Sequence, residues 1–426
     1  MDIAMLVYEY PPLIVGGLGT YAMEITQQYV KMGHNVTVFA LSNGKLPNRE
    51  LWRGVEVHRP ELVDTSDSMP TIITEDVKKW GMGLKFFSDI TLYNLLSAVE
   101  LVNHLHKKEE RKFDIVCAHD WLSVMGGVTV KKELKIPLVF HVHSTEKGRT
   151  MGGGSSVINS LEEQGGNAAN QIITVSHAMH DELISLGFPE EKIRVCWNGV
   201  DADKYDPTKV KIEDALKVRE RYGIKENDKM IFFVGRLVTV KGPDRLIMAM
   251  PEILEKVPNA KLVIVGLGEM HIFLKDLVNS LGLKDSVKLR PEFIPEEERI
   301  LHYAACDLAA FPSHYEPFGI VCTEAMSMGK PVVVGARGYT GFRDQVVSFG
   351  PEQCGFHINP EDPTDIAWGI ISVLADPAAA KKYGENARKR VLKYFTWQMA
   401  AKNTLALYQE VLDGVSLRDI EHSNSK

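Results

Sequence analysis

Two glutamates in residues 311–326, FPSHYEPFGIVCTEAM, have the spacing and the neighbours of a ligand site. Glu316 and Glu324 are eight residues apart, and Pro317 between them suits the first turn of a helix better than its interior. We therefore expect Glu316 in a loop and Glu324 on the helix that follows. The unpaired N–H groups of residues 318–321 would form a positive helix end suited to a phosphate. Two carboxylates beside an anion would repel it unless they accept hydrogen bonds from other groups. The hydroxyl groups of a sugar and of a ribose are natural donors for them.

A basic pair beside a glycine turn adds to this site. Arg236 follows Gly235 at the end of a predicted strand, and Lys241 precedes Gly242. A guanidinium and an ammonium group five residues apart can grip a diphosphate, arginine through its planar fork and lysine as a point charge. Taken alone, a solvated surface pair explains these residues equally well. The helix start in the same half of the chain favours the diphosphate.

Polar residues also follow two predicted strands of the first half. His119 and Asp120 come after the strand 115–118, and His143 comes after the strand 138–141. In parallel α/β sheets the ligand crevice lies outside the carboxyl ends of the strands. A lone histidine at such a place is more often structural than catalytic. These residues are therefore candidates for a site, and neither reading is excluded by position alone.

The alternation of strands and helices predicts an α/β protein with two doubly wound domains. Buried strands are expected at 3–8, 35–40, 115–118, 138–141, 172–175 and 193–196, and again at 230–234, 262–265, 287–289, 308–311 and 332–334. The boundary is expected near residue 205, giving domains at 1–205 and 206–396. Gly17, Leu18 and Gly19 open a helix predicted at 20–32, where missing side chains let a backbone approach a ligand, although close packing explains such glycines about as often.

Composition limits the classes of partner. The 426 residues are 45% hydrophobic and 25% charged, enough for two cores, and the net charge of -7 argues against nucleic acid. Five separated cysteines predict neither a disulfide framework nor a zinc site, and a reducing compartment fits. Because neither a signal peptide nor an apolar run of about 18 residues is recognisable, we expect a cytoplasmic protein without a transmembrane segment.

Two further features could indicate a metal or a membrane. Asp201 and Asp203 form a D-x-D sequence, which we interpret as a turn and cap; no metal is expected, because protein cations can neutralise a diphosphate. Basic runs at 107–112 and 381–393 are interrupted by glutamates. Solvated helix faces are therefore favoured, and a peripheral membrane contact is the alternative.

Together these motifs resemble, over essentially the whole chain, the retaining nucleotide-sugar glycosyltransferases of the GT-B fold. The likeness is to glycosyltransferase family 4, with its sucrose-phosphate and trehalose synthases, and to the related glycogen synthases. The matching segments are residues 16–19, 119–121, His143, 175–176, 198–201, 235–236, 241–242 and the E-x7-E from Glu316 to Glu324. The resemblance implies two Rossmann-like domains facing a deep cleft, with the terminal helix 397–426 crossing back to the first domain.

The resemblance also implies roles for the residues of the second domain. Arg236 and Lys241 would bind the donor diphosphate and assist its departure. Glu316 would lie near the donor sugar, and Glu324 would bind the ribose. The backbone amides placed against the sugar and phosphates would be those of Phe318, Gly319, Ile320 and Val321.

In the first domain, the loop of Gly17, Leu18 and Gly19 would close over the donor phosphates. His143 would contact the donor sugar near its reacting carbon, and Asp120, with His119 beside it, would lie where the acceptor enters. The implied mechanism is retention by same-face attack through an oxocarbenium-like transition state, without an enzymic nucleophile. This differs from the two-carboxylate scheme of most glycosidases.

The expected function is therefore transfer of a hexose, with glucose favoured, from UDP- or ADP-glucose to an α-glucan or a small sugar, without metal or cofactor. Transfer to a lipid or other non-glucan acceptor is an alternative within the family, and a GT-B-like sugar-nucleotide epimerase is one of another class. Bacterial glycogen synthases carry a lysine where Val15 stands, which weakens the case for ADP-glucose. Residues 143–149, HSTEKGR, resemble α-glucan-making relatives and leave the acceptor open.

Overall fold

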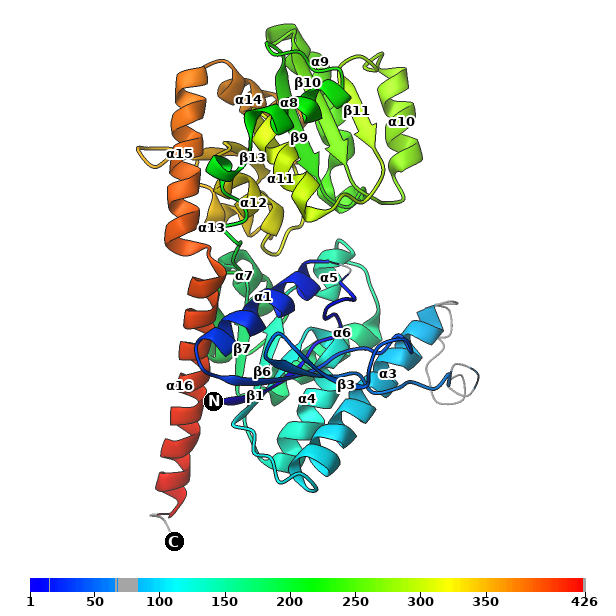
Figure 1. The fold of residues 1–426 in the computed structure, drawn as a ribbon, viewed down its shortest axis with the longest axis vertical. Helices are drawn as coiled ribbons and strands as arrows, with labels where there is room; N and C mark the ends of the chain where they lie inside the picture. Colours follow the sequence, from blue (N-terminus) through cyan, green and yellow to red (C-terminus); the bar gives the residue numbers. More distant parts are fainter. Residues whose placement is uncertain (15, 66, 68–82, 424–426) are drawn as a thin grey trace. The chain divides into compact units, whose positions relative to one another are not determined.

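The chain divides into two compact units, shown in a computed structural model that describes residues 1–14, 16–65, 67 and 83–423 (Figure 1). Unit 1 comprises Met1–Val175, His180–Trp197 and Trp397–Lys426, and unit 2 comprises Ser176–Met179 and Asn198–Thr396. The last helix therefore belongs to unit 1, and residues 198–205 belong to unit 2. Each unit is built around its own sheet.

The sheet of unit 1 has eight strands in the order β3-β4-β2-β1-β5-β6-β7-β8. All neighbours are parallel except β3 and β4, which pair antiparallel at the edge. The strands are β1 (Asp2–Leu6), β2 (Asn35–Phe39), β3 (Arg49–Trp52), β4 (Val55–His58), β5 (Ile115–His119), β6 (Leu138–Val142), β7 (Gln171–Thr174) and β8 (Ile193–Val195). Every residue of β5 and β6 is buried, as expected of parallel strands covered on both faces.

Helices cover this sheet. They are α1 (Gly17–Lys31), α3 (Gly83–Val99) with a π-helical continuation (Glu100–His106), α4 (Trp121–Leu134), α5 (Glu146–Arg149), α6 (Ser156–Ala168), α7 (His177–Ser185) and α16 (Trp397–Ser423), with a 3-10 turn at Glu190–Lys192. Helices α3, α4 and α6 pack in a row, and α1 packs against α16. The C-terminal helix thus completes the core of unit 1.

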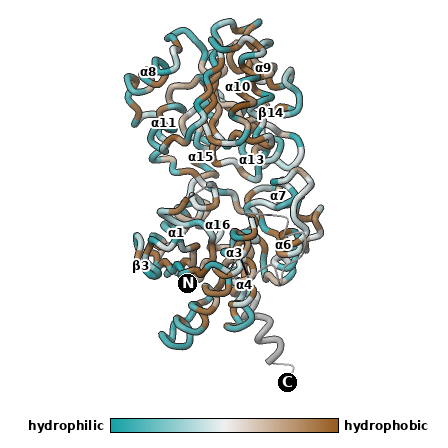
Figure 2. Tube along the Cα trace, turned by 90° about the vertical axis from the view of Figure 1, so that its right-hand side faces the viewer, coloured by the Kyte–Doolittle hydropathy of each residue, from teal (hydrophilic) through white to brown (hydrophobic). Residues whose placement is uncertain are grey.

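Unit 2 has a six-stranded parallel sheet in the order β11-β10-β9-β12-β13-β14. The strands are β9 (Lys229–Val234), β10 (Ala260–Val265), β11 (Val287–Arg290), β12 (Leu308–Phe311), β13 (Val332–Gly335) and β14 (Gly355–Ile358). The helices are α8 (Ile212–Arg221), α9 (Pro243–Lys256), α10 (His271–Ser280), α11 (Glu296–Ala305), α12 (Ile320–Ser327), α13 (Phe342–Gln345), α14 (Pro363–Leu374) and α15 (Pro377–Tyr394), with 3-10 turns at Pro207–Lys209 and Thr239–Lys241. Figure 2 shows α8, which has one buried residue, as largely hydrophilic.

In both units the strand order changes direction beside the first strand of the sheet. The reversal lies between β1 and β5 in unit 1 and between β9 and β12 in unit 2. In open α/β sheets a ligand binds outside the carboxyl ends of the strands at such a point. The loops after β1, β5, β9 and β12 are therefore where a site is expected, and they carry the residues that the sequence singled out.

The predicted strands are all present, with ends shifted by one or two residues, and both doubly wound sheets are confirmed. The strands β3, β4 and β14 were not predicted, because each includes partly exposed residues and none forms a continuous apolar run. The first helix starts at Gly17 and not at residue 20, so the glycines belong to its first turn. All five cysteines are free and buried. Among the described residues, no helix is both long and apolar enough to span a bilayer.

Candidate active site

Lys241 and Glu316 form a close ion pair at the reversal point of unit 2. Lys241 ends the turn after β9, and Glu316 lies in the loop after β12. Lys241 Nζ lies 2.5 Å from Glu316 Oε2, and the two side chains are only 17% and 12% exposed. The pair therefore places one cation and one carboxylate side by side where a ligand of a parallel sheet binds.

The backbone holds these two loops together. Gly242 adopts a φ of 66°, and a Cβ atom there would lie 2.2 Å from the carbonyl oxygen of Pro312. The backbone N–H of His314 also donates to the carbonyl of Val240 at 2.8 Å. Only glycine satisfies both the left-handed conformation and this close approach. Gly242 thus fixes the distance between the Lys241 turn and the Glu316 loop.

Glu316 lies in the loop and Glu324 on helix α12, as the sequence predicted. The helix begins at Ile320, with Gly319 as its N-cap at a φ of 89°; a Cβ atom there would lie 2.2 Å from the ring of Phe342. Phe318, expected at the helix start, precedes the helix and is buried, with its ring 6.0 Å from that of Phe395. The available helix N–H groups therefore begin later than predicted.

Three hydrogen bonds fix the loop before α12. Gly341 N donates to the carbonyl of Glu316 at 2.7 Å, and Ser176 Oγ donates to the carbonyl of Pro317 at 2.6 Å. Gln345 Nε2 donates to the carbonyl of Phe318 at 2.6 Å. The carbonyl groups are thus engaged on the protein side. The first N–H groups of an α-helix have no intrahelical partner, so those of Ile320 and Val321 can receive an anion.

Arg236 follows β9 and is exposed. Among the described residues it makes no side-chain hydrogen bond and no ion pair, in contrast to Lys241. Its guanidinium can therefore turn toward an anion at the end of β9 without breaking a contact. The structure thus brings Arg236 to the same loop region as the Lys241–Glu316 pair.

Glu324 is 4% exposed and is surrounded by protein donors. Its carboxylate accepts hydrogen bonds from Arg299, Tyr205 and Tyr303. Sequence reasoning missed these three residues. Arg299 and Tyr303 are four apart on α11, a spacing that places them on one face, but their partner could not be read from it. A ribose hydroxyl would have to displace one of these donors to reach Glu324.

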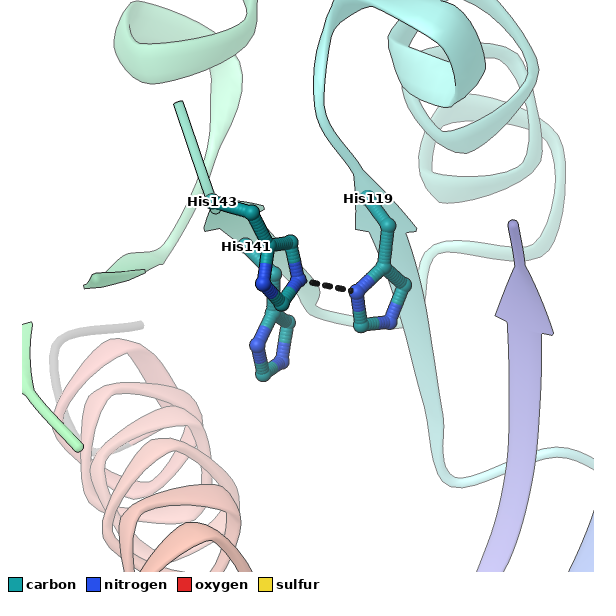
Figure 3. A group of neighbouring side chains, drawn as sticks. All are labelled: His119, His141 and His143. Atoms are coloured by element: carbon teal, nitrogen blue, oxygen red, sulfur yellow. Dashed lines mark hydrogen bonds between the residues drawn. The ribbon is translucent and has the colours of Figure 1, made fainter. Parts of the chain in front are cut away.

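In unit 1, three histidines gather at the ends of β5 and β6 (Figure 3). His119 pairs with His141 across the two strands, and His143 lies two residues further along on the same face. His119 Nδ1 lies 3.0 Å from His143 Nε2, and His141 Nε2 lies 2.8 Å from Tyr408 Oη. The His-x-His spacing on a strand could have predicted that His141 joins the other two.

Burial keeps these imidazoles neutral. It lowers the pKa of His119 and His141 well below the usual value, and neighbouring histidines add to the effect. Burial also lowers the pKa of His143, although Asp120 opposes it. The ring of Tyr21 packs edge-on against His143 at 4.5 Å. His143, the half-buried member of the cluster, therefore presents a neutral ring at neutral pH.

Among the described residues, these three histidines have the spacing to hold a metal ion. One ligand nitrogen of each histidine lies within 4.8 Å of those of the other two. Their rings, however, lie within 21°, 22° and 14° of parallel for the three pairs. Imidazole lone pairs lie in the ring plane, so near-parallel rings do not direct them to one point. A metal would require the rings to turn, and the absence of a metal requirement stays a prediction.

Asp120 organises the strand ends and is itself buried, at 4% exposure. Its Oδ1 accepts hydrogen bonds from the backbone N–H of His143 at 2.7 Å and of Ser144 at 3.4 Å. Its backbone has a φ of 55° and a ψ of 177°, which non-glycine residues rarely adopt. The Asp120 side chain, which was expected to contact an acceptor, thus binds the backbone of the loop that contains His143. Asp120 does so from a strained backbone conformation.

The glycine turn of unit 1 is packed around Glu9. The backbone N–H of Gly16 donates to Glu9 Oε2 at 3.0 Å, and a Cβ atom on Gly19 would lie 2.9 Å from the same oxygen. Leu18 packs against the apolar cluster that includes Trp121. Gly17 is exposed. Val15 lies outside the described residues.

The D-x-D sequence forms a turn, as predicted. Asp201 Oδ1 accepts hydrogen bonds from the backbone N–H groups of Asp203 at 3.1 Å and Lys204 at 3.0 Å. Lys204 also pairs with Glu296 at 3.2 Å. These contacts give Asp201 a capping role.

The two doubly wound units, with the E-x7-E glutamates and a basic pair at the reversal of the second sheet, define the class of protein as a GT-B glycosyltransferase. Residues 15–204 match the family described as Glycosyltransferase Family 4, and residues 214–390 match Glycosyl transferases group 1. The chain belongs to the family 4 glycosyltransferases of the GT-B fold. The sequence-based recognition is thereby confirmed, and membership implies a nucleotide-sugar donor and an acceptor.

Proteins that match this chain over nearly their whole length are described as glycosyltransferases of different kinds. The chain is 34% identical to an uncharacterized glycosyltransferase of Methanocaldococcus jannaschii, over 97% of this chain and 99% of that protein. It is 30% identical to a glycogen synthase of Mycobacterium tuberculosis (96% and 94%) and 29% identical to a D-inositol 3-phosphate glycosyltransferase of Kineococcus radiotolerans (93% and 91%). The solved sucrose-phosphate synthase of Thermosynechococcus elongatus superimposes with a TM-score of 0.76 at 22% identity, covering 97% of this chain and 99% of that one. This likeness supports the fold.

Proposed function

We propose that this protein is a retaining hexosyltransferase that moves glucose from a nucleoside diphosphate sugar to an α-glucan or a small sugar acceptor, without a metal ion. The observation that carries the proposal is the Lys241–Glu316 pair, 2.5 Å apart at the reversal of the unit 2 sheet and next to the start of α12. It combines a cation for a leaving diphosphate with a carboxylate for sugar hydroxyls.

In this proposal the donor diphosphate lies against Arg236, Lys241 and the N–H groups of Ile320 and Val321. Lysine, arginine and a helix N-terminus all favour a dianion, and their charges are fixed before the reaction begins. Glu316 accepts hydrogen bonds from the sugar once the diphosphate takes over Lys241. After this exchange the Lys241 ammonium group is paired with the diphosphate, and the Glu316 carboxylate is hydrogen-bonded to the sugar hydroxyls.

The transfer step breaks the bond between the sugar C1 and the diphosphate oxygen and forms a bond from C1 to an acceptor hydroxyl on the same face. The acceptor proton leaves with the diphosphate, so that no enzymic base is required. The protein contributes stabilisation of the developing diphosphate charge and alignment of the acceptor. His143, as a neutral ring, contacts the sugar without adding a positive charge beside the oxocarbenium-like centre.

The acceptor is the less constrained half of the proposal. The relation to a glycogen synthase supports a glucan, with Asp120 and His119 at the acceptor side of unit 1. The relation to D-inositol 3-phosphate glycosyltransferases supports a second candidate, a non-glucan acceptor that carries a phosphate. A lipid acceptor and a sugar-nucleotide epimerase have no specific observation in their favour.

The test is a transfer assay with UDP-, ADP- and GDP-glucose and the corresponding galactose and mannose donors, each with glycogen, maltose, inositol 3-phosphate or buffer. We expect nucleoside diphosphate release that depends on the acceptor, and a product with the donor's anomeric configuration by NMR. A product of inverted configuration would refute the mechanism. Interconversion of the sugar nucleotides without acceptor would identify an epimerase.

A further inference from the structure

Gln345 connects the short helix α13 to the loop before α12. It is the last residue of α13 and is fully buried, with an exposed fraction of 0%. Its Nε2 donates to the carbonyl of Phe318 at 2.6 Å and lies 3.5 Å from the carbonyl oxygen of Gly319. Both neighbours are acceptors, so only the NH2 end of the side-chain amide fits between them. Gln345 therefore serves as a donor, which neither an ionised carboxylate nor an apolar side chain could replace.

Helix α13 is itself fixed behind this loop. Arg390 on α15 donates from Nε to the carbonyl of Gln345 and from Nη2 to the carbonyl of Asp344, each at 2.7 Å. The ring of Phe342, which is 0% exposed, fills the space that a Cβ atom on Gly319 would occupy. The side chain of Gln345 thus reaches the loop from a backbone that is held in place.

The hydrogen bond from Gln345 determines where the N–H of Gly319 points. The carbonyl of Phe318 and the N–H of Gly319 belong to one planar trans peptide unit, in which the two groups point in opposite directions. Because the carbonyl faces α13, the N–H is directed away from α13. Among the described residues, this N–H has no acceptor. Gly319 is buried, and buried N–H groups are nearly always paired, so we expect an acceptor from outside the chain.

The conformation of Gly319 suits an anion as that acceptor. Gly319 has a φ of 89° and a ψ of 72°, and the right-handed helix α12 begins at the next residue, Ile320. Such a change of hand lets successive N–H groups face one concavity, which favours an anion. Glu316 Cγ lies 2.9 Å from the position that a Cβ atom on Gly319 would take. The Gly319 N–H therefore lies beside the Lys241–Glu316 pair of the proposed donor site.

We propose that Gln345 is a positioning residue, which directs the Gly319 N–H toward the donor diphosphate by holding the carbonyl of the same peptide unit. This inference deepens the proposed function and rests on it, because it concerns how the donor site binds phosphate. Gln345 acts through the backbone and adds no charge. Its effect on a ligand is therefore confined to the phosphate groups.

The first experiment compares ligands with and without phosphate. Calorimetry identifies which of UDP, ADP and GDP the wild-type protein binds, and competition against that nucleotide gives the Kd of the matching nucleoside. Gln345→Met keeps the length of the side chain and removes the donor. We expect it to raise the Kd of the diphosphate by about tenfold and that of the nucleoside by less than about twofold. An unchanged diphosphate Kd, or an equal loss for both ligands, would overturn the proposal.

The second experiment uses a side chain whose donor depends on pH. Gln345→Glu has nearly the same shape, and its carboxyl group can donate to the Phe318 carbonyl only while it is protonated, a state that burial favours. The diphosphate Kd is divided by the wild-type Kd at the same pH, which removes the titration of the ligand. We expect this ratio to be within about threefold of one at pH 5.5 and to rise toward the Gln345→Met value at pH 8.5.

The other outcomes of this pH series also decide the role of the donor. A Gln345→Glu protein that already binds as weakly as Gln345→Met at pH 5.5 would refute it. A ratio that stays near one at both pH values would support it, because the buried carboxyl group would then have kept its proton. A merely structural role of Gln345 would give no such difference between the two variants.

Gln353→Met is the matched control, because Gln353 Nε2 also donates to a backbone carbonyl of unit 2, that of Gly355, at 3.3 Å. Its diphosphate Kd should stay within about twofold of wild type. Urea unfolding of each variant shows whether it is folded under the conditions of the binding assay. If Gln345→Met were unfolded, Gln345→Glu at the two pH values would still provide the test.

Inorganic pyrophosphate separates this inference from the proposed function. If wild type bound none of the three nucleotides, the proposed function would fail. Pyrophosphate binding that weakens in Gln345→Met would still support the role of Gln345 in holding an anion site. Pyrophosphate that binds both proteins equally, or binds neither, would refute that role.

Discussion

Separating Lys241 from Glu316 should affect folding stability and turnover in different ways. The variants are Lys241→Met, Glu316→Gln and the double variant. Lys241→Met leaves a carboxylate with 12% exposure beside an apolar side chain, and Glu316→Gln leaves an ammonium group with 17% exposure beside a neutral amide. In the double variant neither charge is present. The chemistry proposed for the pair is lost in all three.

The separation gives the magnitude. At 2.5 Å the attraction between the two charges is about 7 kcal/mol for an effective dielectric constant near 20, and desolvation of both groups offsets much of it. Removing one partner of a fully buried pair costs about 3–5 kcal/mol. Because these side chains keep some contact with water, we expect each single variant to lose about 2–3 kcal/mol of unfolding free energy and the double variant to lose about 1 kcal/mol.

Urea unfolding measures the three losses, and a transfer assay measures turnover in parallel. We expect kcat to fall by about 10²–10³ in each single variant, with no recovery in the double variant. Recovery of stability without recovery of turnover would support a pair that is both structural and catalytic. Additive stability losses, or a single variant with near-normal kcat, would refute the reasoning.

Three further predictions concern other parts of the chain. EDTA should leave transfer activity largely unchanged. A complete loss of activity would make Asp201, Asp203 or the histidine cluster candidate metal ligands again. Burial raises the pKa of Glu162 from 4.5 to about 8, so the carboxyl group binds its proton more tightly in the folded protein than in the unfolded chain. Stability should therefore fall between about pH 4.5 and 8, by at most about 1.4 kcal/mol per pH unit, and Glu162→Gln should flatten the thermal unfolding profile in that range. Gly242→Ala should lower the melting temperature and kcat/KM together, because its Cβ would lie 2.2 Å from Pro312 O at a φ of 66°; an active, stable variant would contradict the spacing role of this glycine.

The sequence predicted what depends on local pattern. Runs of apolar residues identified the strands, and Pro317 placed Glu316 before the helix and Glu324 on it. The same reasoning could not find the partners of Glu324. Tyr205 lies 119 residues away from it, and only the packing of α11 and α12 brings Arg299 to the carboxylate.

A similar limit applies to unit 1. The positions of His119 and Asp120 at a strand end were readable, because a polar pair follows an apolar run. That Asp120 would turn its carboxylate to the backbone of His143 depends on β5 and β6 being neighbours, which the order of strands along the chain does not specify. Roles that depend on which strands are adjacent therefore remained outside the prediction.

The two ends of the segment formed by residues 198–396 lie next to each other. Val200 and Thr396 form a parallel bridge, and Val200 N donates to the carbonyl of Phe395 at 2.9 Å. Because its two ends are hydrogen-bonded to each other, this segment can be replaced by the matching segment of a relative without changing the distance between the two junctions. Chimeras built at these two points would carry the Lys241–Glu316 pair from one parent and the three histidines from the other, and would reveal which parent dictates the choice of sugar nucleotide.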